Sequence, residues 1–211
     1  MINTLQGYDR QYYRGKNSNY LFWYCNLKAR FFWRRRLAMI DAIAGRKHAR
    51  LLDVGCAFGY LLKFLERRFQ VHGVDISGYA VEQSRALLSD ASRIKIFDIR
   101  NGIPFKEQFD VITAFDVMEH IEDPLRVFES FRLMLKPDGV LYLEFPVKKT
   151  IINFDTSHCY RNLDAWCSLL GQAGFKPDHI RGYYTIGMRM VMIPVRSARV
   201  QNYCSIVAGL R

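Results

Sequence analysis

The stretch LLDVGCAFGYLLKFL, residues 51–65, decides the fold of this chain of 211 residues. It reads as an apolar strand, an acidic residue, a glycine-containing turn and an amphipathic helix. A turn of this kind places a helix N-terminus at the carboxyl edge of a sheet, where α/β domains bind nucleotide-like ligands. Gly55 and Gly59 allow the backbone to approach such a ligand closely. Taken alone, this glycine spacing can also serve simply to turn a strand into a helix.

Strand-like and helix-like runs alternate along most of the chain, which predicts an α/β fold on a mostly parallel sheet with helices on both faces. Seven strands are expected, at residues 49–55, 70–75, 93–98, 109–115, 139–145, 176–184 and 203–210. Helices are expected at residues 59–68, 79–89, 124–136 and 163–173. The long loop at residues 146–161 is expected to shape a site, and the segment between the last two strands is expected to be irregular.

Composition predicts a folded, cytoplasmic chain. Hydrophobic residues make up 50% and aromatic residues 14% of the sequence, which is too rich for a disordered chain. No uncharged run reaches the roughly 18 residues that a membrane-spanning helix needs, and the first residues lack the features of a secretory signal. The 5 cysteines include no C-x-x-C pair, so we expect reduced thiols and no structural zinc site.

Positive charge is concentrated at the two ends of the chain. Residues 1–50 hold 11 Lys and Arg against 2 Asp and Glu, whereas residues 51–145 hold 11 against 15. Residues 146–211 again are basic, with 9 against 3. The ends therefore favour an anionic partner, and nucleic acid, a phosphorylated substrate and a membrane surface all remain open at this point.

Three carboxylates lie at the ends of three successive expected strands. Asp53, Asp75 and Asp98 have no role in a core at such positions, which indicates ligand binding. Asp75 lies where an α/β nucleotide site places a carboxylate for the ribose hydroxyls, and Asp98 is placed to accept the exocyclic amine of an adenine. The turn lacks the G-x-G-x-x-G order of pyrophosphate sites. A ligand with positive charge fits these carboxylates better.

At these positions the chain resembles the class I S-adenosylmethionine-dependent methyltransferases. The likeness runs through DVGCAFG, GVDIS, IFDIR, FDVITAFDVMEHIEDP, LKPDGVLYLEFP and LLGQAGF, over roughly residues 49–176. It implies a Rossmann-like sheet of seven mostly parallel strands, an N-terminal helical lid and S-adenosylmethionine as cofactor. It divides the chain into a basic, aromatic helical extension at residues 1–48 and a cofactor-binding domain at residues 49–211.

The resemblance also implies a role for each residue of the cofactor site. The methionine side would be bound by Asp53, Gly55, Ala57 and Gly59, the ribose by Asp75 with Ile76, and the adenine edge by Asp98 with Ile99, while Phe115 and Asp116 would form the floor near the sulfonium. The family pattern usually has glycine where this chain has Ala57. If that position needs a left-handed backbone, alanine costs on the order of 1 kcal/mol.

The chain contains VMEH at residues 117–120 and HCY at residues 158–160. These resemble two motifs of the family subgroup that methylates small molecules, sugars and lipid-linked precursors. An oxygen or nitrogen nucleophile is helped by a base that removes its proton, and His120 and His158 are the candidates. His120 can equally anchor the helix that follows it. Asp116, Glu119 and His120 also resemble a metal-binding cluster of some quinone-precursor O-methyltransferases. The first position there is normally glutamate, so no metal is assigned.

Two other functions compete with a small-molecule methyltransferase. The basic ends suggest a nucleic-acid methyltransferase, but no N-P-P-Y-type tetrapeptide follows the fourth strand and no RNA-binding module is apparent. We therefore expect no nucleic-acid partner. The second alternative is a cofactor-binding scaffold without catalysis, which the three strand-end acids disfavour.

The segment at residues 19–44 is expected to form a helix before the first strand. One interpretation is a lid that packs its aromatic side chains over the cofactor and the sheet edge. The other is that its aromatic and arginine residues, including Arg34, Arg35 and Arg36, rest on an anionic membrane or bind a phosphorylated acceptor. Both are compatible with different turns of one helix.

Overall fold

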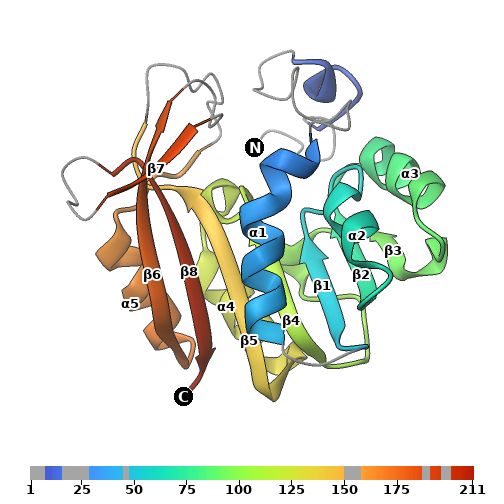
Figure 1. Cartoon of the computed structure of the whole chain (residues 1–211). Coiled ribbons are helices and arrows are strands. Elements are labelled where there is room, and N and C mark those ends of the chain that lie inside the picture. Colours follow the sequence, from blue (N-terminus) through green and yellow to red (C-terminus); the bar gives the residue numbers. More distant parts are fainter. Residues whose placement is uncertain (1–7, 16–28, 45–47, 150–157, 187–190, 196–200) are drawn as a thin grey trace.

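Eight strands form a single sheet in the computed structural model of the chain (Figure 1). The structure describes residues 8–15, 29–44, 48–149, 158–186, 191–195 and 201–211. The strands are β1 (Arg50–Val54), β2 (Gln70–Asp75), β3 (Ile94–Ile96), β4 (Phe109–Phe115), β5 (Leu135–Pro146), β6 (Phe175–Ile186), β7 (Val191–Val195) and β8 (Tyr203–Leu210). Their order across the sheet is β3-β2-β1-β4-β5-β8-β6-β7. The first five of these in order are parallel, and β8, β6 and β7 run antiparallel to their neighbours.

Helices cover both faces of the sheet, as expected. They are α1 (Ala29–Ala44), α2 (Tyr60–Leu65), α3 (Gly78–Leu87), α4 (Pro124–Met134) and α5 (Leu163–Gln172). Short 3-10 turns lie at Tyr12–Arg14, Ala91–Arg93, Ile99–Asn101 and Met118–His120. Figure 1 shows α1 and α2 crossing in front of the sheet, with α4 and α5 behind it.

Alternation along the strands divides the core between the two faces of the sheet. Leu51 and Leu52 are both fully buried, but successive side chains of a strand point to opposite faces. Leu51 belongs to the cluster that contains Trp33 of α1 and Leu61 of α2, whereas Leu52 belongs to the cluster that contains Phe128 of α4. Helix α1 and the strand-turn-helix segment at residues 51–65 thus share one core layer.

The expected count of seven strands is wrong, because β7 was expected to be irregular. β6 continues to Ile186, and β7 returns along it with Tyr184 opposite Ile193. Pro194 lies within β7, and proline in an apolar run argues against a strand unless the strand is at an edge. β7 is at the edge of the sheet, which is the position in a sheet where proline is tolerated. The other strand predictions differ from the structure mainly at their ends.

The arginines of α1 differ in exposure, which bears on the interpretation that they contact a membrane or a phosphorylated acceptor. Arg34 is exposed, Arg35 is partly buried, and Arg36 is only 4% exposed. Arg36 therefore points into the protein and is not available to a membrane or to a phosphorylated acceptor. The expected N-terminal part of this helix, residues 19–28, lies outside the described residues. Among the helices that the structure describes, none is long and apolar enough to cross a bilayer.

Candidate cofactor and catalytic site

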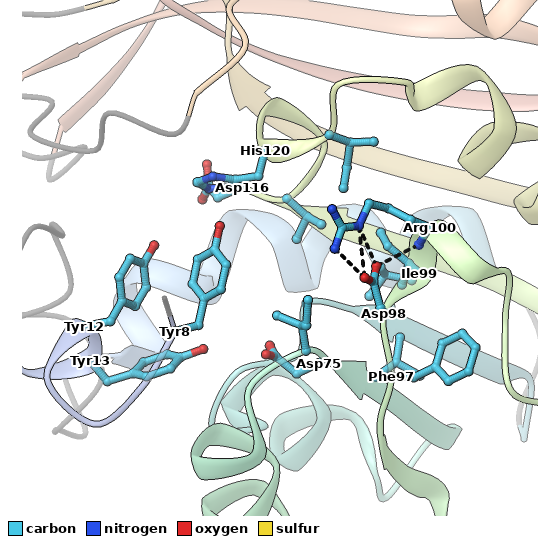
Figure 2. Close-up of a pocket in the computed structure, with 16 residues that line it drawn as sticks. Tyr8, Tyr12, Tyr13, Asp75, Phe97, Asp98, Ile99, Arg100, Asp116 and His120 are labelled. Atoms are coloured by element: carbon cyan, nitrogen blue, oxygen red, sulfur yellow. Dashed lines mark hydrogen bonds and ion pairs between the residues drawn. The ribbon is translucent and has the colours of Figure 1, made fainter. Parts of the chain in front are cut away.

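A cavity lies at the carboxyl ends of the central parallel strands (Figure 2). It is lined by seven residues that the sequence singled out: Gly55, Asp75, Ile76, Asp98, Ile99, Asp116 and His120. Further lining residues were not expected, namely Tyr8, Tyr12, Tyr13, Val54, Val74, Phe97, Arg100, Val117 and Ile121. The carboxyl edge of β1, β2, β3 and β4 therefore collects most of the expected cofactor residues into one site.

The turn after β1 is built from residues with a left-handed backbone. Gly55, Ala57 and Gly59 have φ angles of 71°, 46° and 74°. A Cβ atom at Gly55 would lie 2.2 Å from Cγ2 of Val117, so only glycine fits there without a shift. Ala57 is the departure from the family pattern, and its positive φ meets the condition under which alanine costs about 1 kcal/mol. The turn keeps its shape despite that strain because the Ala57 N–H donates to Asp75 Oδ2 at 2.9 Å.

Asp75 ends β2 with a carboxylate that main-chain donors hold in place. Its Oδ1 accepts from the Ser77 N–H at 2.8 Å, and its Oδ2 accepts from the Ala57 N–H. Burial raises the pKa of Asp75 to about 6, against the lowering effect of these hydrogen bonds. Each carboxylate oxygen has a second lone pair for another donor. The side chain therefore suits a pair of ribose hydroxyls, and the residues present fit the nucleoside part of S-adenosylmethionine.

Asp98 lines the cavity but is held by a side chain that sequence reasoning missed. Arg100 donates from Nε to Asp98 Oδ1 at 2.9 Å and to Oδ2 at 3.0 Å. Hydrogen bonding from Arg100 lowers the pKa of Asp98. Figure 2 shows this pair at the wall of the cavity. An adenine amine at Asp98 would share the carboxylate with Arg100, and the two-residue spacing D-x-R was the signal that could have revealed the pair.

Five predicted site residues lie beside the cavity and do not line it. Ala57, Gly59, Asp53, Phe115 and His158 are absent from the lining that the described residues form. Asp53 is 5% exposed and accepts from Thr113 Oγ1 at 2.7 Å, and burial raises its pKa to about 7. Gly59 is the N-cap residue of α2, where a Cβ atom would lie 2.3 Å from Ser84 Oγ. Phe115 packs against Tyr142 with ring centroids 4.8 Å apart.

The two candidate bases lie next to each other. The ring centroids of His120 and His158 are 4.6 Å apart, and the rings are nearly perpendicular. Together with buried Glu119 they form a group whose potential ligand atoms all lie within 4.8 Å of one another. The spacing suits either proton exchange or one divalent cation, with His158 replacing the Asp116 of the sequence-based cluster. His158 Nδ1 also lies 3.2 Å from the Tyr160 hydroxyl oxygen.

An N-terminal tyrosine cluster, Tyr8, Tyr12 and Tyr13, closes one side of the cavity (Figure 2). Tyr8 packs edge-on against His120 at 5.9 Å between centroids, and its carbonyl oxygen accepts a hydrogen bond from Ser77 Oγ. Tyr13 is buried against Phe58 of the turn after β1. The sequence YDRQYYRG carries three tyrosines within six residues, a signal that could have revealed this wall.

Comparison with known proteins assigns the family. A family model described as a methyltransferase domain matches residues 27–180. The chain belongs to this methyltransferase family. The predicted class, S-adenosylmethionine-dependent methyltransferases with a Rossmann-like α/β fold, is confirmed, and so is the predicted cofactor, S-adenosylmethionine.

Individual relatives of this methyltransferase are similar over part of its length. A ubiquinone biosynthesis O-methyltransferase of Neisseria meningitidis serogroup C is 33% identical over 116 residues, which are 51% of this chain and 48% of that protein. The chain thus spans about half the length of the curated relative. A methyltransferase structure from Mesorhizobium loti superimposes with a TM-score of 0.66 at 16% identity, covering 87% of this chain and 99% of that one.

Structural similarity alone does not set the reaction. The [4+2]-cyclase SpnF superimposes with a TM-score of 0.61 at 20% identity, over 82% of this chain and 80% of that one. That likeness shows the fold alone, and the same fold supports a cyclase. The reaction of this methyltransferase-family chain has to be argued from its own site.

Proposed function

We propose that this chain transfers a methyl group from S-adenosylmethionine to an oxygen atom of a small-molecule acceptor. The observation that carries the proposal is that one cavity contains both the Asp75 carboxylate and the imidazole of His120, with His158 beside it. An oxygen nucleophile needs its proton removed, and a histidine pair supplies the base. The relatives named O-methyltransferases support oxygen over nitrogen. A sugar or a lipid-linked molecule falls within this acceptor class.

When bound, S-adenosylmethionine supplies an activated methyl group on a sulfonium centre. In the proposed mechanism Asp75 accepts hydrogen bonds from the ribose hydroxyls and fixes the cofactor in the cavity. The tyrosine cluster excludes water from one side. His120 accepts the proton of the acceptor hydroxyl as the oxygen attacks, and His158 is near enough to relay that proton toward Tyr160. The chain thus contributes alignment of the reactants, exclusion of water and removal of one proton.

The experiment is a search for the acceptor with the purified chain. Cell extract is incubated with the protein and S-adenosylmethionine, and small molecules that gain one methylene unit are detected by mass spectrometry. Repeating the incubation with methyl-deuterated cofactor verifies that the added carbon comes from S-adenosylmethionine, and the Asp75→Ala variant gives the background. A protein that binds the cofactor but labels nothing would indicate a scaffold, and labelling of RNA would indicate a nucleic-acid methyltransferase.

The proposed lid and membrane contact concern the extension at residues 1–48. The tyrosine cluster supports a lid, because it lines the cavity ahead of α1. The membrane contact rests on Arg34, which is exposed, and on the aromatic and basic sequence at residues 16–28. Sedimentation with anionic vesicles at low salt tests it: loss of binding in Arg34→Gln supports a peripheral contact, and no binding by the wild type excludes one.

A further inference from the structure

A buried cluster of charged and phenolic side chains joins α1 to the antiparallel half of the sheet. Arg36 donates from Nε to Glu144 Oε2 at 2.6 Å, and its Nη2 lies 3.0 Å from the Tyr203 hydroxyl oxygen. Glu144 is fully buried and Arg36 nearly so. Burial lowers the pKa of Arg36, but Glu144, Tyr203 and Asp116 together outweigh it, and the pKa lies well above its ordinary value. A buried ion pair of this kind is weak evidence for stability, because desolvation offsets the attraction.

Asp116 connects this cluster to the cofactor cavity. Its Oδ2 lies 3.2 Å from Arg36 Nη2, and its Oδ1 accepts from the Tyr203 hydroxyl at 3.0 Å. The same residue lines the cavity at the end of β4, with a left-handed φ of 60°. The conformation is uncommon outside glycine, although aspartate tolerates it better than most residues. Two groups from α1 and β8 therefore fix a carboxylate that belongs to the cavity wall.

Aromatic packing fixes the orientation of Arg36 as well. Its guanidinium carbon lies 4.5 Å from the ring centroid of Phe115 and 4.9 Å from that of Trp33. A planar guanidinium can stack on aromatic rings while it donates to two carboxylates, which a lysine ammonium cannot do. Trp33 is on the same helix as Arg36, so the docking of α1 sets where the guanidinium lies.

We propose that Arg36 and Tyr203 are positioning residues for methyl transfer, which hold the Asp116 carboxylate in the cavity wall from outside the cavity. The proposal rests on the proposed function, in which the cavity binds S-adenosylmethionine. The sulfonium of this cofactor is positively charged, whereas the sulfur of its product, S-adenosylhomocysteine, is neutral. A carboxylate held in the wall attracts the charged cofactor more than the neutral product. The clamp on Asp116 therefore favours binding of the donor and release of the product.

Calorimetry with the two ligands tests the proposal on the full chain. Tyr203→Phe removes the hydroxyl that donates to Asp116 and keeps the buried ring. We expect it to lower the preference for S-adenosylmethionine over S-adenosylhomocysteine by about two- to tenfold, the value of one hydrogen bond. In an Asp116→Asn background the same substitution is expected to change the preference no further. Arg36→Lys is expected to lower the preference as well, because an ammonium cannot replace both contacts.

Tyr142→Phe is the matched control. Tyr142 is equally buried and its hydroxyl donates to Glu144 in the same cluster, but no hydrogen bond from it to Asp116 is among those that the structure describes. It is expected to leave the preference unchanged. An unchanged preference in both Tyr203→Phe and Arg36→Lys would overturn the proposal, and so would an equal change in Tyr142→Phe. If the wild type binds neither ligand, the proposed function fails too, whereas binding with an unchanged preference overturns only the positioning role.

Discussion

Two buried carboxylates, one in the parallel half of the sheet and one where the pairing becomes antiparallel, are held in different ways. Asp75 in the parallel half is held by main-chain N–H groups of the residues around it. Glu144, in the strand where the sheet changes to antiparallel pairing, is held by the guanidinium groups of Arg35 and Arg36. The main-chain donors leave lone pairs on the Asp75 oxygens for a ligand. The two arginines belong to α1, so their ion pairs with Glu144 attach that helix to the sheet. In the proposed function Asp75 is thus arranged to receive the cofactor, whereas Glu144 anchors α1 to the sheet.

The histidine pair is where the parallel half would perform chemistry, and it carries the largest expected effect. If His120 or His158 is the base, the His120→Gln or the His158→Gln variant, respectively, is expected to turn over an oxygen acceptor about 10² to 10⁴ times more slowly. Cofactor affinity is expected to change little. His179→Gln, on the exposed face of β6, is the control. Near-normal rates in both single variants would mean that alignment alone suffices.

The main-chain-bound carboxylate gives the next largest effect. Asp75→Ala is expected to weaken S-adenosylmethionine binding by about 1 to 3 kcal/mol, because two hydroxyls lose a charged acceptor. Asp178→Ala provides the control, since Asp178 is exposed on β6 at the other side of the sheet. Calorimetry that finds equal affinities for wild type and Asp75→Ala would remove Asp75 from the cofactor site.

The raised pKa of Asp75 predicts a pH dependence of cofactor binding. Below its pKa of about 6 the free protein binds a proton that must leave before the ionised carboxylate accepts the ribose hydroxyls. Affinity is therefore expected to fall by about tenfold per pH unit below that pH, with a flatter profile in Asp75→Asn. The effect on protein stability has the opposite sign. Because the carboxyl pKa of Asp75 is raised in the folded state, it contributes stability at low pH, which is lost as the pH rises through about 6. A wild-type affinity that stays constant from pH 7 to pH 5 would contradict the assignment.

The strained turn gives the smallest expected effect. Ala57→Gly relieves a left-handed alanine but loosens the unfolded chain, so the two contributions partly cancel. We expect the free energy of unfolding to rise by less than about 1 kcal/mol. Gly55→Ala is the opposing variant and is expected to lower it, because its Cβ would meet Val117. Denaturant unfolding of the two variants measures both, and a stabilised Gly55→Ala would show that the turn is not constrained as described.

The same contrast explains what could be predicted from the sequence. In the parallel half, Ala57 of the turn after β1 is only 18 residues from Asp75. One local pattern of strand, turn, helix and strand therefore reveals both. Arg36 and Glu144 are separated by 108 residues, and no local pattern shows that an arginine in a basic run turns inward. Arg100 and the tyrosine cluster were missed for a different reason, although D-x-R at residues 98–100 and the tyrosine-rich run at residues 8–13 were local signals. These signals show that Arg100 can pair with Asp98 and that tyrosines cluster, but only the folded chain shows that both segments line the cavity.

Amide hydrogen exchange with and without S-adenosylhomocysteine tests the division between the two halves most directly. The proposed binding site predicts that the ligand slows exchange in the turn after β1, around Ser77, around Arg100 and in the tyrosine cluster. It predicts no change in β6 and β7, which lie at the end of the sheet away from β1 and β2. Protection confined to β6 and β7, or no protection anywhere at saturating ligand, would contradict the claim that this cavity is the cofactor site.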